Sequence, residues 1–525
     1  MNMAFSIIDI IVFVLYGLLI IGLGLYVSRQ PKGVEKNASD YFLASNSLPW
    51  WAVGASLIAA NISAEQFIGM SGSGFKIGLG IAAYEWMAAL TLVLIALFFI
   101  PIYLKKGIFT MPQFLEQRFD KRVKVVMAIF WLFVFVFINL TSILYLGALA
   151  VHNMFGISLF WSIFFLAVFA MVYSIYGGLK AVAWTDVIQV IFLVGGGFVV
   201  TWIAVSKLGD GHFISGFKNM VDAAPEKFDL ILDKSNPSYK ELPGIGVLLG
   251  GMWIANLYYW GCNQYIIQRA LASKSVAEAQ KGLIFAGFLK LLLPLIVVIP
   301  GIAAFLLHQQ GLITINKPDN AYPVLLSLIP QGLRGLAFAA LVAAILSSLA
   351  SMMNSISTIF TMDIYKTYFN KNASEKRLVN TGRLSALVAM VIAILIAPFL
   401  SNLDQAFQYI QEFTGFISPG ALAIFLTGFF YKKATSNGAL AAALGTFVFS
   451  ILFKFVWPEI PFLDRMGYVF LICLFIIWIF AVIENKPTSD KVIALKKEMF
   501  KTTTGFKIGA LLIVIILIIL YSIWW

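Results

Sequence analysis

The chain has 525 residues, of which 61% are hydrophobic and only 12% are charged. Soluble domains carry about 25% charged residues, so this chain cannot cover a water-facing surface of its own size. The composition excludes a soluble enzyme and a disordered protein. The net charge of +12 does not indicate nucleic-acid binding either, because the basic residues form short clusters between long apolar runs, as in the loops of membrane proteins.

Apolar segments long enough to cross a membrane follow one another along the chain. The first is the uncharged run 10–28 between Asp9 and Arg29. No basic residue precedes this run and it is long for the apolar part of a signal peptide, so we predict a membrane span. Further spans are predicted from apolar runs of similar length, namely 49–73, 78–104, 123–151, 158–176, 182–206, 243–268, 280–307, 321–365, 380–400, 404–431, 435–457, 462–483 and 508–525.

The basic residues predict how these spans are oriented. If the N-terminus lies outside and the spans alternate, most of the 37 Lys and Arg residues fall on the cytoplasmic side, as the positive-inside rule requires. We therefore predict an all-α protein with about 14 membrane helices and both termini outside. The segment 321–365 is too long for one straight span, so its part around Asn320–Arg334 is expected to lie outside the apolar layer.

Two of the predicted spans have polar runs at their middle. The run Asn61-Ile-Ser-Ala-Glu-Gln66 lies in 49–73, and the run Asn256–Gln264, which contains Gly261, lies in 243–268. Polar groups inside a membrane cost free energy unless they are satisfied. Such runs favour helices that are interrupted, with free carbonyls that can bind a cation. A continuous helix that packs through small and polar residues is the alternative.

The positions of these two spans predict an internal repeat. The second interrupted span lies five helices after the first, and an odd offset gives the two halves opposite orientations in the membrane. We predict inverted repeats of five helices at 49–206 and 243–431, with an extra N-terminal helix at 10–28 and extra C-terminal helices in 435–525 of this single transmembrane domain.

Isolated polar side chains in other spans mark a candidate solute site. They are Glu85, Lys290, Gln411 and Glu412. A structural ion pair between Glu85 and Lys290 is one interpretation. The other is recognition of hydroxyl groups, because a carboxylate accepts hydrogen bonds, an ammonium donates them and amides do both. Together with an aromatic ring such as Tyr259, these groups suit a neutral polyol.

A third pattern suggests a cation site. Ala344, Ser347 and Ser348 are spaced i, i+3 and i+4, so they share one face of a helix. Two hydroxyls and a free carbonyl can supply oxygen ligands to a small cation. Serine in a membrane helix more often bonds to the backbone of its own helix, so the pattern alone does not distinguish a cation site from a structural role.

From the first span to about residue 431, the chain resembles the sodium:solute symporter family. The resemblance rests on Ser56–Gly74 (SLIAANISAEQFIGMSGSG), Tyr173–Gln189 (YSIYGGLKAVAWTDVIQ), Ala255–Arg269 (ANLYYWGCNQYIIQR), Ser347–Tyr365 (SSLASMMNSISTIFTMDIY) and Ala406–Gly415 (AFQYIQEFTG). It implies the leucine-transporter-type fold, which has two inverted five-helix repeats and extra helices at the ends.

The resemblance also implies the role of individual residues. The sodium site would consist of the carbonyls of Ala59, Ile62 and Ala344 and the hydroxyls of Ser347 and Ser348, with Asp186 on the sodium exit path. The sugar site would consist of Gln66, Glu85, Asn256, Lys290 and Gln411, with Tyr259 stacked on the sugar ring as the inner gate. The outer lid would consist of Met70, Tyr84 and Phe407.

These observations predict a sodium-coupled symporter for a galactose- or glucose-like hexose in the bacterial inner (plasma) membrane. Ala88 replaces a serine of the sugar-transporting relatives, which leaves the identity of the sugar open. The alternatives are a symporter of the same fold for inositol, an amino acid or a carboxylate, and a sugar sensor that does not transport. No nucleophile–base pair or nucleotide motif predicts an enzyme, and the oligomeric state does not follow from the sequence.

Overall fold

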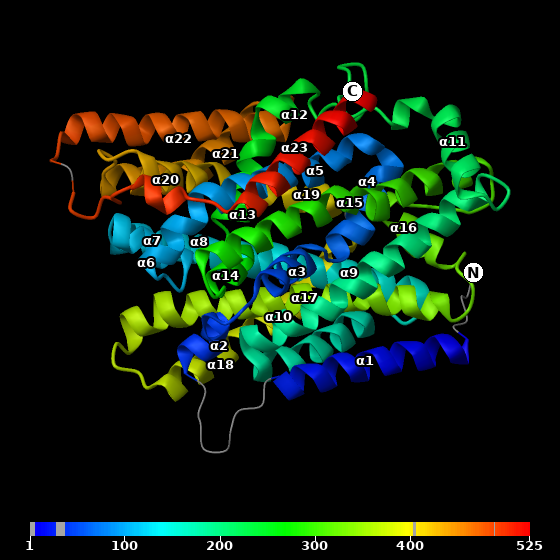
Figure 1. Ribbon diagram of the computed structural model, residues 1–525, viewed down its shortest axis with the longest axis horizontal. Helices are drawn as coiled ribbons and strands as arrows, with labels where there is room; N and C mark the ends of the chain where they lie inside the picture. The colour runs from blue at the N-terminus through cyan, green and yellow to red at the C-terminus, as the bar shows by residue number, and fades with distance from the viewer. Residues whose placement is uncertain (1–5, 28–36, 403–405, 488) are drawn as a thin grey trace.

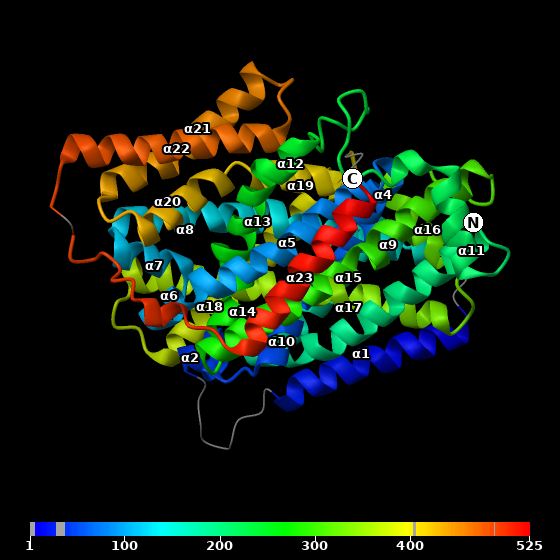
Figure 2. The same cartoon turned by 45° about the horizontal axis from the view of Figure 1, so that its top comes forward.

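The computed structural model describes residues 6–27, 37–402, 406–487 and 489–525. Within these ranges the chain is helical, and the one β-type contact is an isolated parallel bridge between Leu48 and Ser273. Most of the long helices run side by side along the long axis of the molecule (Figures 1 and 2). The predicted all-α class is confirmed.

Ten stretches within the described residues are long and apolar enough to cross a membrane. They are Ile7–Gly24, Leu79–Lys106, Lys121–Phe155, Leu179–Lys207, Val276–Gln309, Leu333–Phe369, Glu375–Ser401, Ser436–Val456, Phe462–Glu484 and Thr504–Ile523. The pair Phe407–Thr414 and Ser418–Phe430, bent by 46°, would form an eleventh. The protein is therefore a multi-pass membrane protein.

The helices of the first half begin with α1 (Ile7–Val27) and α2 (Ala38–Leu43). The next are α3 (Trp50–Asn61), α4 (Ser71–Lys76), α5 (Ala83–Leu94), α6 (Ile100–Lys106), α7 (Met111–Arg118), α8 (Lys121–Val134), α9 (Thr141–Phe155), α10 (Leu159–Lys207) and α11 (Phe213–Ala223). Short π-helical turns join α5 to α6 and α8 to α9, so that each pair forms one long span.

The second half begins with α12 (Ile245–Leu249), α13 (Gly251–Gly261) and α14 (Gln264–Leu271). The next are α15 (Val276–Gln309), α16 (Ala321–Leu326), α17 (Leu333–Ile359), α18 (Glu375–Ile396), α19 (Ala406–Thr414), α20 (Ser418–Phe430), α21 (Ser436–Val456), α22 (Phe462–Glu484) and α23 (Thr504–Ile523). The part of 321–365 that was expected to lie apart is the separate short helix α16, and the long span begins at Leu333.

The two spans predicted at 158–176 and 182–206 fall within one helical run, α10, which has 49 residues. A straight helix of that length would measure about 74 Å, more than twice the roughly 30 Å apolar thickness of a bilayer. Among the described residues, its apolar parts are Leu159–Val172 and Leu179–Lys207. Backbone hydrogen bonding therefore does not mark the boundary that the sequence predicted.

The first polar run interrupts its helix, as predicted. α3 ends at Asn61, and Ile62 has an extended conformation with φ −77° and ψ 101°. The chain then resumes as a π-helical turn, Glu65–Met70, which leads into α4. The hydroxyl of Ser63 accepts a hydrogen bond from the amide of Glu65 at 3.0 Å, which stabilises the new helix start.

The second polar run is interrupted as well. α13 ends at Gly261, and Asn263 is extended with φ −88° and ψ 120° before α14 starts. The side chain of Asn263 accepts a hydrogen bond from the amide of Tyr265 at 3.1 Å and so caps α14. Both helix breaks that the sequence predicted are confirmed.

Small residues bring the first interrupted helix close to α15. A Cβ on Gly54 of α3 would lie 2.6 Å from the carbonyl oxygen of Gly282, which is closer than side-chain carbons approach. A Cβ on Gly301 would lie 2.1 Å from the carbonyl oxygen of Ser71. The close approach matters because α15 carries Lys290 into the centre of the bundle. Small-residue packing and the helix break, considered above as alternatives, therefore occur together.

The N-terminal helix is attached to α17. The carboxylate of Asp9 accepts hydrogen bonds from the amides of Gly332 and Gly335, at 2.7 and 2.8 Å. Asp9 thus satisfies amides at the start of α17, which have no partner within their own helix, and its negative charge faces the positive end of the helix dipole. α17 also packs extensively along α10.

Candidate functional site

A small buried cavity lies between the two interrupted helices. Its volume is about 50 Å³, well below the roughly 300 Å³ of typical ligand pockets. The lining comes from the π-helical turn after α3, from α5, α13, α15 and α19, and from the bend into α20. All the side chains predicted for the sugar site line it, namely Gln66, Glu85, Asn256, Tyr259, Lys290 and Gln411.

An ion pair crosses this cavity. The ammonium of Lys290 donates hydrogen bonds to the carboxylate of Glu85 and to the side-chain carbonyl of Asn61. Lys290 and Glu85 are only 1% and 3% exposed, and the ammonium also lies 4.9 Å from the centre of the Trp260 ring. The ion pair considered from the sequence is therefore present, and its two members also line the cavity.

Asn61 joins the ion pair to the predicted inner gate. Its amide nitrogen donates a hydrogen bond to the hydroxyl of Tyr259 at 3.0 Å. Asn61 is the last residue of α3, and its side chain lines the cavity. Lys290, Asn61 and Tyr259 thus form one chain of contacts between α15, α3 and α13.

The amide side chains of the site are less tightly held. Gln66 accepts a hydrogen bond from the amide of Ser63 at 3.1 Å, and Asn256 donates one to the carbonyl of Met252 in its own helix at 3.2 Å. Gln411 faces the cavity, whereas its neighbour Glu412 does not line it. Glu412 instead forms ion pairs with Arg465 and Lys454, at 2.8 and 3.3 Å. Glu412 therefore has a structural role away from the cavity.

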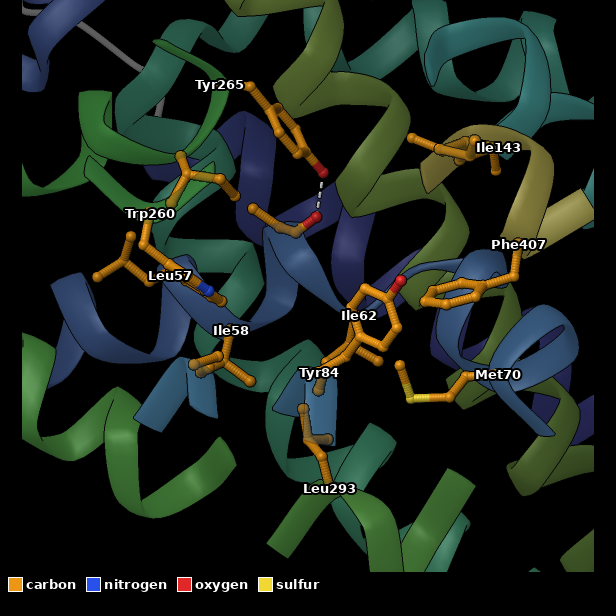
Figure 3. Packing of buried hydrophobic residues seen from close by; sticks show 14 of the residues in the cluster. Leu57, Ile58, Ile62, Met70, Tyr84, Ile143, Trp260, Tyr265, Leu293 and Phe407 are labelled. Carbon is orange, nitrogen blue, oxygen red and sulfur yellow. Dashed lines mark hydrogen bonds between the residues drawn. The ribbon is translucent and has the colours of Figure 1, made fainter. Parts of the chain in front are cut away.

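The three side chains predicted as the outer lid all line the cavity. Figure 3 shows Met70, Tyr84 and Phe407 gathered around Ile62. The rings of Tyr84 and Phe407 meet edge to face with their centres 5.3 Å apart, and all three side chains are buried. A Cβ on Gly69 would lie 2.8 Å from the Cβ of Phe407, so the absence of a side chain there lets Phe407 approach the π-helical turn closely.

The candidate cation site lies where the end of α3 meets α17. In a regular helix, the amide of Ser63 would donate to the carbonyl of Ala59, but it donates to Gln66 instead. The amide of Gln66 donates to the carbonyl of Ser63 at 3.2 Å, so it does not donate to the carbonyl of Ile62, as it would in a regular helix. The helix break therefore withdraws the usual donors from the carbonyls of Ala59 and Ile62.

The two serines of α17 bond to neighbouring helices. Ser348 donates to the carbonyl of Ala60 in α3 at 2.8 Å, and the hydroxyl of Tyr265 donates to the same carbonyl (Figure 3). Ser347 donates to the carboxylate of Asp186 in α10. Within the described part of the chain, neither hydroxyl bonds to its own helix. Ala344, one turn before Ser348, is fully buried.

Asp186, predicted for the sodium exit path, connects three helices. Its carboxylate accepts hydrogen bonds from Ser347 of α17 and from Ser56 of α3, the latter at 2.5 Å. Asp186 is fully buried and does not line the solute cavity. It therefore lies next to the candidate cation site and apart from the cavity.

Several cavity residues did not enter the predicted site. They are Asn61, Glu65, Ala255, Trp260, Thr414, Ser418 and Met466. One carboxylate oxygen of Glu65 and the hydroxyl of Thr414 are buried with no hydrogen-bond partner among the described residues. Asn61 and Glu65 belong to the polar run that predicted the helix break, so this run was the available signal for them. Thr414 and Ser418 reach the cavity through the bend between α19 and α20, which the sequence did not predict.

Interrupted helices that meet at a buried polar cavity, within a bundle of membrane spans, define a secondary transporter. Comparison with solved structures shows the fold directly. The chain is similar to a Na⁺-coupled sialic acid symporter solved in a substrate-bound outward-open state, with a TM-score of 0.81, 24% identity and coverage of 93% of this chain and 100% of that one. It is more distantly similar to a transporter of the nucleobase-cation-symport-1 family, with a TM-score of 0.57, 14% identity and coverage of 87% and 98%.

The chain belongs to the sodium:solute symporter family, whose model matches residues 41–445. It is 55% identical to a sodium/glucose cotransporter of Vibrio parahaemolyticus over 99% of this chain and 98% of that protein. It is 34% identical to the human sodium/myo-inositol cotransporter, over 84% of this chain and 66% of that protein. The predicted family is confirmed, and the protein is a sodium-coupled solute transporter rather than an enzyme.

Proposed function

We propose that the protein co-transports sodium and a neutral hexose across the bacterial inner membrane. The observation that carries this proposal is the chemistry of the cavity, whose lining includes two carboxylates, one ammonium and four side-chain amides beside aromatic rings. These groups match the hydroxyls and the apolar face of a sugar. The relatives named as sodium/glucose cotransporters support the hexose, and the Vibrio origin of one of them supports the bacterial membrane.

The site residues receive the following roles in this proposal. Gln66, Glu85, Asn256, Lys290 and Gln411 bind the sugar hydroxyls, and Tyr259 stacks on the ring as the inner gate. Met70, Tyr84 and Phe407 form the outer lid. Sodium binds to the carbonyls of Ala59, Ile62 and Ala344 and to the hydroxyls of Ser347 and Ser348, and it leaves past Asp186. The withdrawn donors at Ala59 and Ile62 support this cation site.

The coupling between the two substrates follows from the interrupted helix. Sodium would connect the end of α3 to α17, and the same helix end carries Asn61 and Gln66 into the sugar cavity. A cation that orders this helix end therefore favours the state that binds sugar. With its present volume of about 50 Å³, the cavity must widen to admit a sugar, and the hydroxyls of the sugar would then replace contacts of Lys290 and Glu85.

We also infer about 14 spans, in two inverted repeats at 49–206 and 243–431, with both termini outside. The three predicted spans beyond the eleven noted above are the two interrupted helices and the first apolar part of α10, which begins at Leu159. The residues near both termini contact segments that the same alternating topology places outside. Asp9 caps the start of α17, and the carbonyls of Trp524 and Trp525 accept hydrogen bonds from Leu230 and Ile231, at 2.9 and 3.3 Å.

The experiment that tests the function is sodium-gradient uptake into proteoliposomes, with a panel of hexoses, pentoses and inositols. Saturable uptake of a hexose that collapses when sodium is replaced by potassium is the expected result. Preference for inositol would favour the second candidate, which the relatives named as myo-inositol cotransporters support. Strong sodium-dependent uptake of proline or pantothenate, with none for hexoses, would refute the sugar site. Binding of sugar without accumulation would identify a sensor.

A further inference from the structure

A second cavity lies at the end of the bundle where α7, α8, α20, α21 and α22 meet (Figures 1 and 2). Its volume is about 260 Å³, and it shares no lining residue with the solute cavity. The lining comes from the turn between α7 and α8, from the connection between α20 and α21, and from the residues that follow α22. Three segments that are distant in the sequence therefore build one site.

This cavity is strongly basic. Five basic side chains line it, against one carboxylate, and they are Arg118, Arg122, Lys432, Lys433 and Lys486. Arg122 pairs with that carboxylate, Asp120, at 2.7 Å. Although burial opposes it, hydrogen bonds from Arg122 and from the amide of Val123 hold the pKa of Asp120 below its ordinary value. The charge of Arg122 is thus already neutralised.

The charges of the other basic side chains are only partly neutralised. Lys486 pairs with Glu484. Arg118 is buried and donates to the carbonyls of Gly428 and Tyr431, at 2.9 and 3.1 Å, so its position is fixed, but no carboxylate among the described residues pairs with it. Lys432 and Lys433 are exposed, and neither has an ion-pair partner within the described residues. The cavity therefore presents an excess of positive charge.

The start of α21 also borders the cavity, and the carboxylate of Glu484 lies next to it, where it accepts a hydrogen bond from the hydroxyl of Thr435 at 3.2 Å. The lining includes Thr435, which caps this 21-residue helix, and the first helical residues Ser436 and Asn437. The hydroxyl of Thr435 accepts from the amide of Gly438 at 3.2 Å. The backbone amides of Ser436 and Asn437 lie at the positive end of the helix dipole.

The surroundings indicate what kind of anion fits. The basic connection follows directly on Phe430, which is 49% exposed, and Lys486 follows closely on Ile483, which is 74% exposed. Both residues are at the ends of membrane-spanning helices, so their apolar surface faces lipid. A ligand that places a negative group in the cavity and hydrocarbon along α20 and α22 would satisfy both kinds of surface.

We propose that this cavity binds the phosphate head group of an anionic phospholipid such as phosphatidylglycerol. Lys432 and Lys433 contact the phosphate, Arg118 holds the connection between α20 and α21 in place beneath it, and the acyl chains lie against the exposed apolar side chains of α20 and α22. Basic pockets between the ends of membrane helices are suited to such head groups. A soluble phosphate would use the charge but not the adjoining apolar surface.

The test is native mass spectrometry of the full-length protein in detergent, titrated with phosphatidylglycerol or phosphatidylcholine. The variant K432Q/K433Q should weaken retention of phosphatidylglycerol about 30-fold, and K433Q alone about fivefold. The matched control is K496Q/K497Q, which removes two adjacent exposed lysines outside the cavity. It should leave retention unchanged, and size-exclusion profiles should show that all variants are folded.

Three results would overturn the proposal. Equal losses in the two double variants would mean that diffuse surface charge attracts the lipid. Equal retention of phosphatidylcholine by the unmodified protein would mean that the head-group charge is not recognised. Displacement of the lipid by low millimolar inorganic phosphate would identify a site for soluble phosphate instead.

Discussion

Substitution of Ser348 by alanine tests the sodium site most directly. The hydroxyl of Ser348 connects α17 to the carbonyl of Ala60 at the end of α3, and the proposal makes the same hydroxyl a sodium ligand. The carbonyl of Ala60 also accepts a hydrogen bond from Tyr265, so the substitution leaves no buried acceptor without a partner. Its effect on folding should therefore be modest, at about 0.5–1.5 kcal/mol.

The effect on sodium binding should be larger. A contact between a charged group and one oxygen ligand contributes about 1.5–3 kcal/mol, which corresponds to a loss of sodium affinity of about 10- to 150-fold. Because sodium and sugar binding are coupled, the apparent sugar affinity should recover at high sodium. A change that only loosened the fold would lower uptake at every sodium concentration.

The assay is sugar uptake into proteoliposomes as a function of external sodium, together with the rise in melting temperature that sodium produces in detergent. The matched control is Ser355→Ala, which removes another buried hydroxyl of α17, one that bonds to the carbonyl of Ser351 at 3.0 Å and to the side chain of Gln268 at 3.3 Å but is not a proposed sodium ligand. A Ser348→Ala protein with normal half-saturating sodium in both measurements would show that the cation site lies elsewhere.

Three further predictions follow from the described contacts. Glu85→Ala should abolish sugar binding and lower stability by about 3–5 kcal/mol, because it leaves the buried ammonium of Lys290 unpaired. The double variant E85A/K290A should regain much of that stability in a thermal unfolding assay but no uptake, and a double variant as unstable as the single one would contradict the ion-pair account. Lys227→Ala removes donors to the last carbonyls of α4, Phe75 and Lys76, at 3.1 and 2.7 Å. Because α4 follows directly on Met70 of the proposed lid, the loss should loosen the lid and raise labelling of a cysteine placed at Ala88 in the cavity, and unchanged labelling would refute this link between Lys227 and the lid. Asp9→Ala removes the cap of α17 and should cost about 1–2 kcal/mol, while a loss below the error of the unfolding assay would show that the cap is dispensable.

Local sequence signals were sufficient to predict the two interrupted helices. Polar and glycine residues in the middle of an apolar run cannot be buried in lipid as a regular helix without cost, so the breaks at Ile62 and Asn263 could be predicted. The continuity of α10 could not be predicted, because the pattern of apolar residues indicated two spans while backbone hydrogen bonding continues through both. Composition predicts which residues avoid water, but not whether a helix ends.

The sequence by itself determined that the chain is a multi-pass membrane protein, where two of its helices break, and, through resemblance to its family, which side chains to examine. Only the tertiary structure decided which side chains meet. Gln411 and Glu412 are neighbours in the sequence, yet one lines the solute cavity and the other pairs with Arg465. The link from Lys290 through Asn61 to Tyr259 and the basic cavity around Lys432 likewise depend on segments far apart in the chain. Such contacts arise from the packing of whole helices against one another, which no local pattern of polar and apolar residues specifies.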